Sequence, residues 1–394
     1  MAMIDEFGIH TENEDLHALI AAEIAAHGPI PFRRFMELAL HHPRYGYYAG
    51  PEPVIGPRGD YLTSPEISPL FGAMIGRQVA EVWHRLGEPD PFLVVEPGPG
   101  NGTLARDLLR WAARAEPALR RALRYVLVEP NPAQEERQRR LLAGEPGVTW
   151  GQALPEGITG CIVANELLDA LPVHLVRVSG GELEEAYVDH ARGRFVEVWG
   201  PPSTPEIGRY FAALGLRPGE GCRAEVNLEA PRWMRRAAAA LARGLILTLD
   251  YGYPAARLYA PWRRTGTLLC FYRHAPADDP LTRVGRQDIT AHVDFTTLAR
   301  AGMEAGLVLA GFTTQRDFLV ALGIHDALRV PAGAVPGEEF AVRYRAVLEL
   351  LEPEGGGRVR VLALTRGLDG RLRGFAGTPD PHRALFSRES AQMP

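Results

Sequence analysis

The chain has 394 residues, which at roughly 150 residues per domain predicts about two to three domain equivalents and a sizeable core. Hydrophobic residues make up 46% and charged residues 23%, values close to globular averages that exclude a disordered or collagen-like protein. The formal net charge is −5. Because the sequence also lacks runs of basic residues, we expect no nucleic-acid partner.

All 43 basic residues are arginine, so the chain lacks the lysine of Schiff-base and P-loop chemistry. The three cysteines, Cys161, Cys222 and Cys270, are far apart and form no CxxC pair, which predicts a reducing compartment and no structural metal site. The N-terminal residues are acidic where a signal or transit peptide is basic. No run approaches the roughly 20 apolar residues of a membrane span. We expect a soluble, cytoplasmic protein without membrane contact.

Apolar residues at helical spacing predict two helices within residues 14–41, with a break at Pro29 and Pro31. An aromatic, glycine-rich loop follows, and the helical pattern returns from Pro69 to Leu86. Long ordered loops in compact domains are often functional, so this loop is a candidate part of a site.

The middle of the chain alternates short apolar runs with helical patterns, which predicts a doubly wound α/β fold with a parallel sheet. Ligands of such sheets lie outside the carboxyl ends of the strands. The expected strands cover residues 92–95, 125–128, 148–150, 161–164 and 245–249, and the expected helices cover 103–115 and 134–142.

Residues 172–228 alternate apolar with polar positions between glycine-rich turns, which predicts a small antiparallel insert that caps an edge of the sheet. A helix over 228–243 follows, with Asn227 as its N-cap. A second long polar and aromatic loop then leads to a helix over 296–305. The remaining expectations are an antiparallel strand over 358–365 that closes the sheet and a disordered tail after Thr378.

The segment from Glu96 to Gly102, EPGPGNG, follows a predicted strand and opens a helix, which is the context of a nucleotide site. Its glycines, Gly98, Gly100 and Gly102, have GxGxG spacing rather than the GxGxxG of dinucleotide sites. Glu96 would repel a pyrophosphate but suits a ligand with a sulfonium and an ammonium group. The segment therefore favours S-adenosylmethionine over NAD.

Glu129 lies 27 residues after the last glycine, at the end of the next predicted strand. A carboxylate there can accept hydrogen bonds from two ribose hydroxyls. The alternative is a surface glutamate that caps the following helix. Gln152, Ala153 and Leu154, just past the third strand, are candidates to face the adenine ring.

Methyl transfer from a sulfonium is an in-line displacement, so the protein must chiefly align the acceptor with the methyl group. Asn165, Glu166 and Asp169 follow the fourth predicted strand. If they begin a helix, Glu166 and Asp169 share one face and form an acidic site for a cationic acceptor. The alternative is that both acids only complement the helix dipole.

Other polar residues have simpler interpretations. Thr63, Ser64, Pro65 and Glu66 fit the cap of a helix near Pro65. Asp250, Tyr251 and Tyr253 fit a tight turn, Tyr45, Tyr47 and Tyr48 fit a ligand stack or a loop core, and Trp83 and Phe295 fit the core. The second long loop has no zinc spacing, so we predict turns and no metal ion; its polar residues are His274, Asp278, Asp279, Asp288, His292 and Asp294.

Several motifs, spread from about residue 28 to about residue 310, resemble the MidA family of class I methyltransferases, which includes the mitochondrial complex I assembly factor. They are HPRYGYYAG, GDYLTSPEIS, EPGPGNGTL, ANELLDALPV, LTLDYGYP and DITAHVDF. The resemblance implies a class I, Rossmann-like doubly wound sheet and S-adenosylmethionine as cofactor. For the mitochondrial members it also implies symmetric dimethylation of an arginine on a complex I subunit.

By matching positions, the resemblance places cofactor contacts on the three glycines, on Glu129 and on Asn165–Glu166, with Thr63–Ser68 folded over the cofactor pocket. The sequence departs from the family's pattern at Asn101, where a basic residue is usual, and in the LLCFYRH run. These two differences bear on the identity of the acceptor rather than on the cofactor. The sequence lacks a transit peptide, so we expect a bacterial member. The predicted division is N-terminal helices and cofactor-covering loop (1–90), first core part (91–172), insert (173–228), second core part (229–378) and disordered tail (379–394).

Three functions stay open at this point. The first is a protein arginine methyltransferase in which Glu166 and Asp169 orient a protonated guanidinium. The second methylates an oxygen or nitrogen of a small molecule or peptide, with His274 or His292 as general base. The third is a non-catalytic assembly protein that retains the cofactor pocket. A homodimer is a possible assembly.

Overall fold

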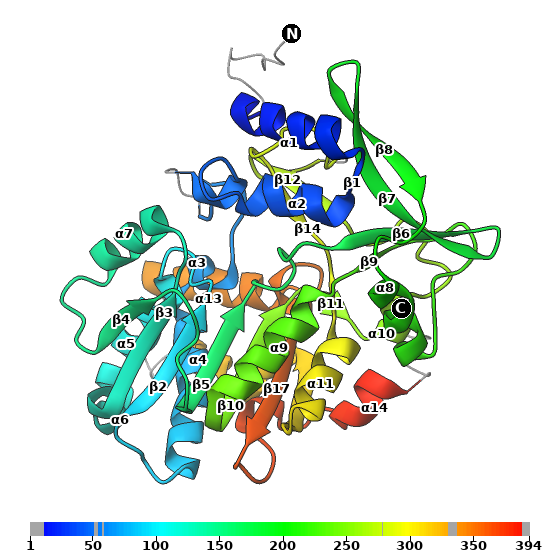
Figure 1. Cartoon of the computed structure of the whole chain (residues 1–394). Helices are drawn as coiled ribbons and strands as arrows, with labels where there is room; N and C mark the ends of the chain where they lie inside the picture. Colours follow the sequence, from blue (N-terminus) through cyan, green and yellow to red (C-terminus); the bar gives the residue numbers. More distant parts are fainter. Residues whose placement is uncertain (1–11, 51–53, 57–58, 278, 330–336, 388–394) are drawn as a thin grey trace.

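The computed structural model describes residues 12–50, 54–56, 59–277, 279–329 and 337–387. A large sheet with helices on both faces forms the lower part in Figure 1, and a smaller lobe lies above it. Within the described residues, no helix is both long and apolar enough to cross a membrane.

The large sheet has seven strands, of which the first five in spatial order are parallel. The predicted parallel sheet is therefore confirmed. The order across the sheet is β4 (Val148–Gly151), β3 (Leu123–Val128), β2 (Phe92–Pro97), β5 (Ile158–Asn165), β10 (Leu241–Asp250), β17 (Arg360–Arg366) and β16 (Val308–Thr314).

The strand predicted near the C-terminus, β17, is antiparallel to both of its neighbours. It does not close the sheet as predicted, because β16 lies outside it at the edge. The pattern over 308–314 hid β16 because Gly311 interrupts it and Val308 is exposed. The helix predicted over 228–243 ends at Ala240, since β10 already begins at Leu241.

Successive strand residues point to opposite faces of the sheet and define two cores. Val94 and Val163 pack in one core, whereas Val95 and Ile162 pack in the other. The first core is covered by α4 (Pro69–Arg85), α5 (Thr103–Ala115), α6 (Pro117–Ala122), α12 (Gln315–Ala321) and α13 (Glu338–Leu351). The second is covered by α9 (Glu229–Ala240), α11 (Phe295–Glu304) and α14 (Pro381–Phe386). Trp83 and Phe295 belong to these cores, as predicted.

The C-terminal segment is ordered as far as Ser387, so the prediction of a disordered tail from residue 379 is wrong for this part. Helix α14 buries Leu385, whose carbonyl accepts a hydrogen bond from Oγ1 of Thr296 at 2.9 Å. The sequence hid this helix because it has only 6 residues. Residues 388–394 lie outside the described part.

The upper lobe combines the N-terminal helices with the predicted insert. Helices α1 (Glu14–His27) and α2 (Phe32–His41), with their predicted break, pack on an antiparallel sheet. Its strands are β1 (Ile30–Pro31), β7 (Glu182–Ala191), β6 (His174–Ser179) and β9 (Arg223–Val226), with β8 (Arg194–Gly200) on β7, and α8 (Pro205–Leu214) follows β8. No described strand of the lobe pairs with the large sheet, so the insert does not cap an edge strand.

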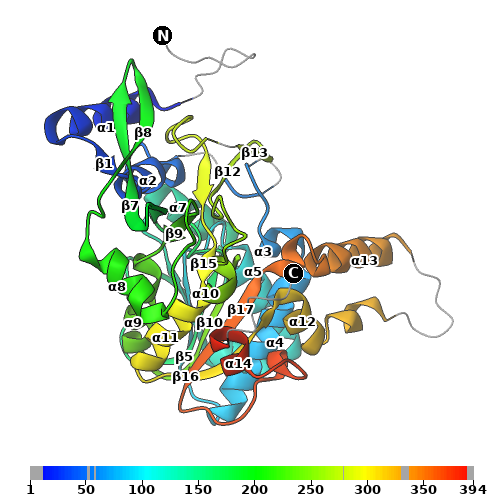
Figure 2. The ribbon, with the colours of Figure 1, turned by 90° about the vertical axis from the view of Figure 1, so that its right-hand side faces the viewer.

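Short elements complete the fold. The second long loop contains an unpredicted antiparallel sheet of β12 (Leu269–Tyr272), β13 (Ala275–Ala277) and β14 (Asp288–Thr290). β11 (Gly252–Tyr253) pairs in parallel with β15 (Val293–Asp294), and α10 (Ala255–Leu258) follows β11. The remaining elements are α3 (Ser64–Ile67), α7 (Pro132–Leu141) and the 3-10 helices Tyr47–Ala49, Ile324–Leu328, Gly356–Arg358 and Arg373–Phe375. Figure 2 shows α13 extending to one side, close to α3.

Candidate active site

The glycine-rich turn follows β2, where the strand order reverses: β3 lies on one side of β2 and β5 lies on the other. Gly98, Gly100 and Gly102 all have left-handed φ angles, of 65°, 53° and 82°. A Cβ atom on Gly98 would lie 2.7 Å from Cδ1 of Leu167. Helix α5 begins directly after the turn, at Thr103. The predicted order of strand, glycine turn and helix is confirmed. Ligands of parallel sheets bind at such a topological switch point.

Glu96, at the end of β2, is only 3% exposed, and Oη of Tyr125 donates a hydrogen bond to its Oε2 at 2.6 Å. Burial raises the pKa of Glu96 to about 8, although the bond from Tyr125 lowers it in part. A nearby cation stabilises the charged form of such a buried carboxyl group. This property fits the expected cationic ligand.

Glu129 follows β3 and is tied to the glycine turn through Gln138. Nε2 of Gln138 donates to Oε2 of Glu129 at 3.0 Å and to the carbonyl oxygen of Gly100 at 2.8 Å. The backbone N–H of Asn131 donates to Oε1 of Glu129 at 2.9 Å. The alternative role of Glu129 as a helix cap is wrong, because the side chain of Asn131 caps α7 by accepting from the N–H of Ala133.

The segment from Thr63 to Ser68 bridges the glycine turn and the acids after β5. Oε1 of Glu66 accepts from Nδ2 of Asn101 at 3.1 Å and from Oγ1 of Thr103 at 2.7 Å. The N–H of Ser64 donates to Oε1 of Glu166 at 3.2 Å. Thr63, Ser64 and Pro65 are buried, and Ser68 rather than Ser64 caps the long helix α4.

Glu166 and Asp169 do not begin a helix, so the predictions of a shared helical face and of a helix-dipole role are wrong. Glu166 has φ of 49° in an irregular turn after β5. Asp250, at the end of the neighbouring strand β10, holds this turn: its Oδ2 accepts from the N–H groups of Leu167 at 3.2 Å and Leu168 at 2.8 Å. This tertiary contact replaces the hydrogen bonds of a helix.

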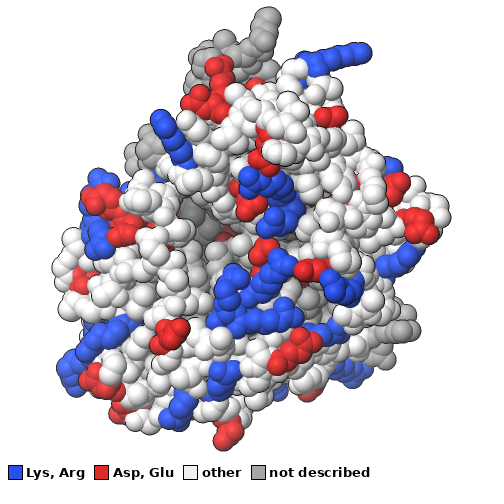
Figure 3. Space-filling view, in the orientation of Figure 1, with Lys and Arg blue, Asp and Glu red and all other residues white. Residues whose placement is uncertain are grey.

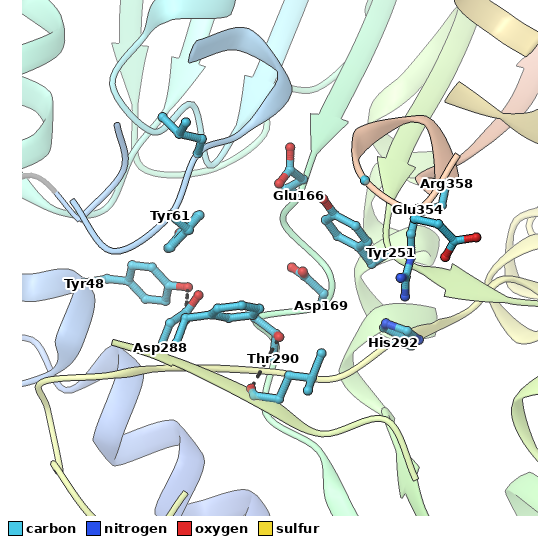
Figure 4. Close-up of a pocket in the computed structure, with 14 residues that line it drawn as sticks. Tyr48, Tyr61, Glu166, Asp169, Tyr251, Asp288, Thr290, His292, Glu354 and Arg358 are labelled. Atoms are coloured by element: carbon cyan, nitrogen blue, oxygen red, sulfur yellow. Dashed lines mark hydrogen bonds between the residues drawn. The ribbon is translucent and has the colours of Figure 1, made fainter. Parts of the chain in front are cut away.

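Glu166 and Asp169 nevertheless line the same cavity, which has a volume of about 260 Å³. Asp288, from β14, is a further carboxylate of its wall, and Tyr48 and Tyr61 are among its aromatic residues. Figure 4 shows Tyr48 and Asp288 on one side, joined by a hydrogen bond of 2.7 Å from Oη of Tyr48. On the face in Figure 3, a hollow lies between the upper lobe and the lower part, with charges of both signs around it.

The acids of the cavity hold their protons more strongly than usual. Burial raises the pKa of Glu166 to about 7 and that of Asp288 to about 6. Burial, together with the charges of Asp250 and Asp288, raises the pKa of Asp169 well above its ordinary value. Several acids that share a buried region repel one another, and a bound cation relieves both penalties.

Of the two histidines predicted as bases, His292 lines the cavity, whereas His274 lies outside it in the turn between β12 and β13. Burial lowers the pKa of His292 to about 3, and the nearby charges of Arg358, Arg263 and Arg360 add to this effect. His292 is therefore neutral near pH 7 but weakly basic.

The other predicted residues have simple positions. Gln152 and Ala153 are exposed beyond the edge strand β4. Asp279 accepts hydrogen bonds in a turn, and Asp294 caps α11, whereas Asp278 lies outside the described residues. Among the described residues, no group of three or more His, Cys, Asp and Glu side chains could hold a metal ion.

The sequence interpretation missed Tyr61, Glu354 and Arg358, which also line the cavity. It took Asp288 for a turn residue. Two motifs gave a signal, since GDYLTSPEIS contains Tyr61 and DITAHVDF begins at Asp288. Glu354 and Arg358 needed the topology, which brings the segment before β17 to the same cavity.

The described residues fit S-adenosylmethionine. Oδ1 of Asn165 is buried without a hydrogen-bond partner among them, which suits a ligand N–H donor. The left-handed glycine turn leaves backbone groups open to close approach, and Glu96 and Glu129 supply carboxylates for a cationic ligand with ribose hydroxyls. Fold and site thus define a class I methyltransferase.

Comparison with known proteins agrees. Residues 74–313 match the model of the family described as "Putative S-adenosyl-L-methionine-dependent methyltransferase", and the chain belongs to this family. It is therefore an enzyme that uses S-adenosylmethionine, as the cofactor prediction stated. The family model thus confirms the resemblance seen in the motifs to a family of methyltransferases.

A crystal structure of a COG1565 superfamily member from Burkholderia thailandensis, bound to S-adenosyl-homocysteine, is 37% identical. It superposes with a TM-score of 0.85 over 94% of this chain and 96% of that one. Among named relatives, the Drosophila melanogaster protein arginine methyltransferase NDUFAF7 homolog, mitochondrial, is 30% identical over 89% of this chain and 84% of its own length. The Mus musculus protein arginine methyltransferase NDUFAF7, mitochondrial, is 32% identical over 78% of this chain and 74% of its own length.

Proposed function

We propose that this methyltransferase acts on a nitrogen of an arginine side chain in a protein or peptide. The observation that carries the proposal is the cavity walled by the carboxylates of Glu166, Asp169 and Asp288 and by the rings of Tyr48 and Tyr61. A guanidinium stays protonated at accessible pH, since its pKa lies above about 12. It binds carboxylates through paired hydrogen bonds and stacks on aromatic rings.

The relatives named above support the same acceptor class, because both carry the name protein arginine methyltransferase. The second candidate, an oxygen or nitrogen of a small molecule or peptide with His292 as base, is less favoured. A base is most effective when its pKa lies near the working pH, and the pKa of His292 is about 3. The cytoplasmic location and the MidA subtype are part of our proposal.

We propose that the glycine turn, Glu129 and Asn165 hold the cofactor, with Thr63 to Glu66 as its cover. Bound there, S-adenosylmethionine supplies an electrophilic methyl group. The carboxylates of Glu166 and Asp169 accept hydrogen bonds from the acceptor guanidinium and direct one of its nitrogens toward that methyl group.

The proton balance assigns a second role to Glu166. The nitrogen forms the new N–C bond while the S–C bond breaks toward sulfur, and the nitrogen then releases one proton. A carboxylate whose pKa is raised to about 7 is a suitable acceptor for this proton near neutral pH. Glu166 then passes it to solvent.

The test is incubation of the purified protein with tritium-labelled S-adenosylmethionine and a lysate of the source cells, followed by separation of proteins from small molecules. We expect label in protein, recovered as methylarginine after acid hydrolysis. Label in small molecules would favour the second candidate. No label above that of a sample without the protein would favour a non-catalytic protein.

A further inference from the structure

The cavity wall that faces away from Tyr48 and Asp288 carries Arg358 and, beside it, the exposed Glu354. The neutral His292 also lines this wall, on the opposite side in Figure 4. Three more arginines surround His292 or its neighbour Tyr253. We call Arg257, Arg263, Arg358 and Arg360 the arginine cluster; they come from α10, the turn after α10, the 3-10 helix Gly356–Arg358 and the start of β17.

Tyr253 lies at the centre of this cluster. The guanidinium carbons of Arg257, Arg263 and Arg360 lie 4.7, 5.0 and 5.7 Å from the centroid of its ring. The ring of His292 packs edge-on against Tyr253 at 5.3 Å between centroids. Cation–π contacts stabilise the guanidinium groups in part, but they do not satisfy N–H donors that point away from the ring.

The cluster has donors without acceptors. The Nε atoms of Arg257, Arg263 and Arg360 are buried, and none has a hydrogen-bond partner in the described part of the chain. Asp317 influences Arg360 electrostatically, yet its Oδ2 accepts a hydrogen bond of 2.8 Å from Oγ1 of Thr314.

The cations also repel one another. Burial and the charges of Arg257 and Arg358 lower the pKa of Arg360. Repulsion between like charges and buried N–H donors without acceptors both cost free energy. A bound anion would reduce both costs.

The cofactor's own carboxylate does not suit this cluster. The glycine turn follows β2, whereas Arg360 lies on β17, three strands further along the sheet. At about 4.8 Å between neighbouring strands, the two places are about 14 Å apart. The cavity reaches from the acids after β5 to Arg358, which is the member of the cluster among its lining residues. Arg263 and Arg360 lie close enough to the lining residue His292 to lower its pKa. An acceptor that spans the cavity therefore contacts Arg358 directly.

We propose that the arginine cluster binds a carboxylate of the acceptor, from an aspartate or glutamate close in sequence to the methylated arginine. This inference rests on the proposed function, because it takes the acceptor to be an arginine-containing peptide. The guanidinium lies toward Glu166 and Asp169, and the acidic side chain lies toward Arg263, Arg358 and Arg360. Opposite charges at the two ends fix the orientation of the acceptor and exclude peptides with the wrong charge pattern.

The test measures binding of fluorescent eight-residue peptides in the presence of S-adenosylhomocysteine. Each peptide has one arginine and one aspartate, with the aspartate two to four residues before or after the arginine. Its partner peptide has asparagine in place of the aspartate. We expect at least one aspartate peptide to bind about tenfold more tightly than its partner, as paired charged hydrogen bonds would provide. The advantage should fall below about twofold in R360Q and in R263Q.

The matched control is R235Q, since Arg235 is an exposed residue of α9 that pairs with Glu304 outside the site. It should keep the full advantage, and R360K should recover part of it. Equal binding of aspartate and asparagine peptides to the unaltered protein overturns the inference. So does an advantage that survives in both R360Q and R263Q, and so does absence of binding by every peptide.

Replacement of the peptide arginine by citrulline separates this inference from the proposed function. If the aspartate advantage remains and citrulline binds as well as arginine, the anion site stands and the arginine acceptor is wrong. If arginine is required but aspartate is not, the acceptor class stands and the anion site is wrong. If inorganic phosphate raises the melting temperature of only the unaltered protein while aspartate gives no advantage, the cluster binds a free oxyanion and the assignment to the acceptor is wrong.

Discussion

The backbone N–H of Ser64 donates a hydrogen bond of 3.2 Å to Oε1 of Glu166, a residue 102 positions later in the chain. Two residues after Ser64, Glu66 binds the side chains of Asn101 and Thr103 beside the glycine turn. The single turn of α3 therefore connects the candidate cofactor site with the candidate acceptor site. A change in either site can reach the other through this segment.

Glu166→Gln should lower kcat by about 100-fold or more, because the amide can accept the bond from Ser64 but cannot take a proton. Affinity for S-adenosylhomocysteine, measured by calorimetry, should change little. The control is Glu304→Gln, since Glu304 is exposed at the end of α11 and pairs with Arg235. Full turnover in the Glu166 variant would remove Glu166 from the chemistry.

Glu129→Ala should weaken binding of S-adenosylhomocysteine by about 1–3 kcal/mol, because charge-assisted hydrogen bonds to the ribose are lost. Glu135→Ala is the control, since Glu135 lies on the following helix α7, where its side chain pairs with the exposed Arg139. Calorimetric titration checks both. Equal affinities of the two variants would show that the ribose is held elsewhere.

Gly100→Val should abolish cofactor binding with a smaller effect on folding. The residue has φ of 53°, and a Cβ atom there would lie 3.0 Å from Cδ1 of Ile55, so the turn must move. The control is Gly181→Val in a distant hairpin. It carries similar backbone strain at φ of 80°, but an added Cβ atom would have no neighbour within 4 Å there. If both variants bind S-adenosylhomocysteine like the unaltered protein, the glycine turn is not the cofactor site.

The free protein should lose stability between pH 6.5 and pH 8.5. Burial raises the pKa of Glu96 to about 8 and that of Glu166 to about 7, from an ordinary value of 4.5. The folded protein thus holds protons that the unfolded chain has already lost, and stability falls as pH rises through the folded-state values. His292, with its lowered pKa, acts in the opposite direction only below this range.

The measurement is the melting temperature, which should fall by a few degrees across this pH range. The double variant Glu96→Gln, Glu166→Gln should show a smaller fall. A melting temperature that rises with pH, or an unchanged slope in the double variant, contradicts the assignment.

Local patterns predicted the parallel strands, the glycine turn and helix α5, because each of these features lies within one continuous segment. They failed for β16 and for β12 to β14, whose short strands mix exposed and buried residues without clear alternation. The shared upper lobe was also missed, since β1 contributes only two residues to the sheet of the insert.

The candidate site shows the same limit. Glu166 and Asp169 were the right residues with the wrong local structure, because spacing alone cannot reveal that Asp250 holds their turn. Asp288 and Arg358 reach the cavity from distant segments, and only the fold brings them together. The homodimer and the cytoplasmic location stay predictions that no observation above tests.

A crystal structure with bound S-adenosylhomocysteine tests the central claim most directly. The account predicts the ribose hydroxyls at Glu129, the amino acid part at the glycine turn and Asn165, and the sulfur facing the cavity of Glu166 and Asp169. A ligand bound away from Gly98 to Gly102, or a sulfur that faces away from these two acids, would contradict it.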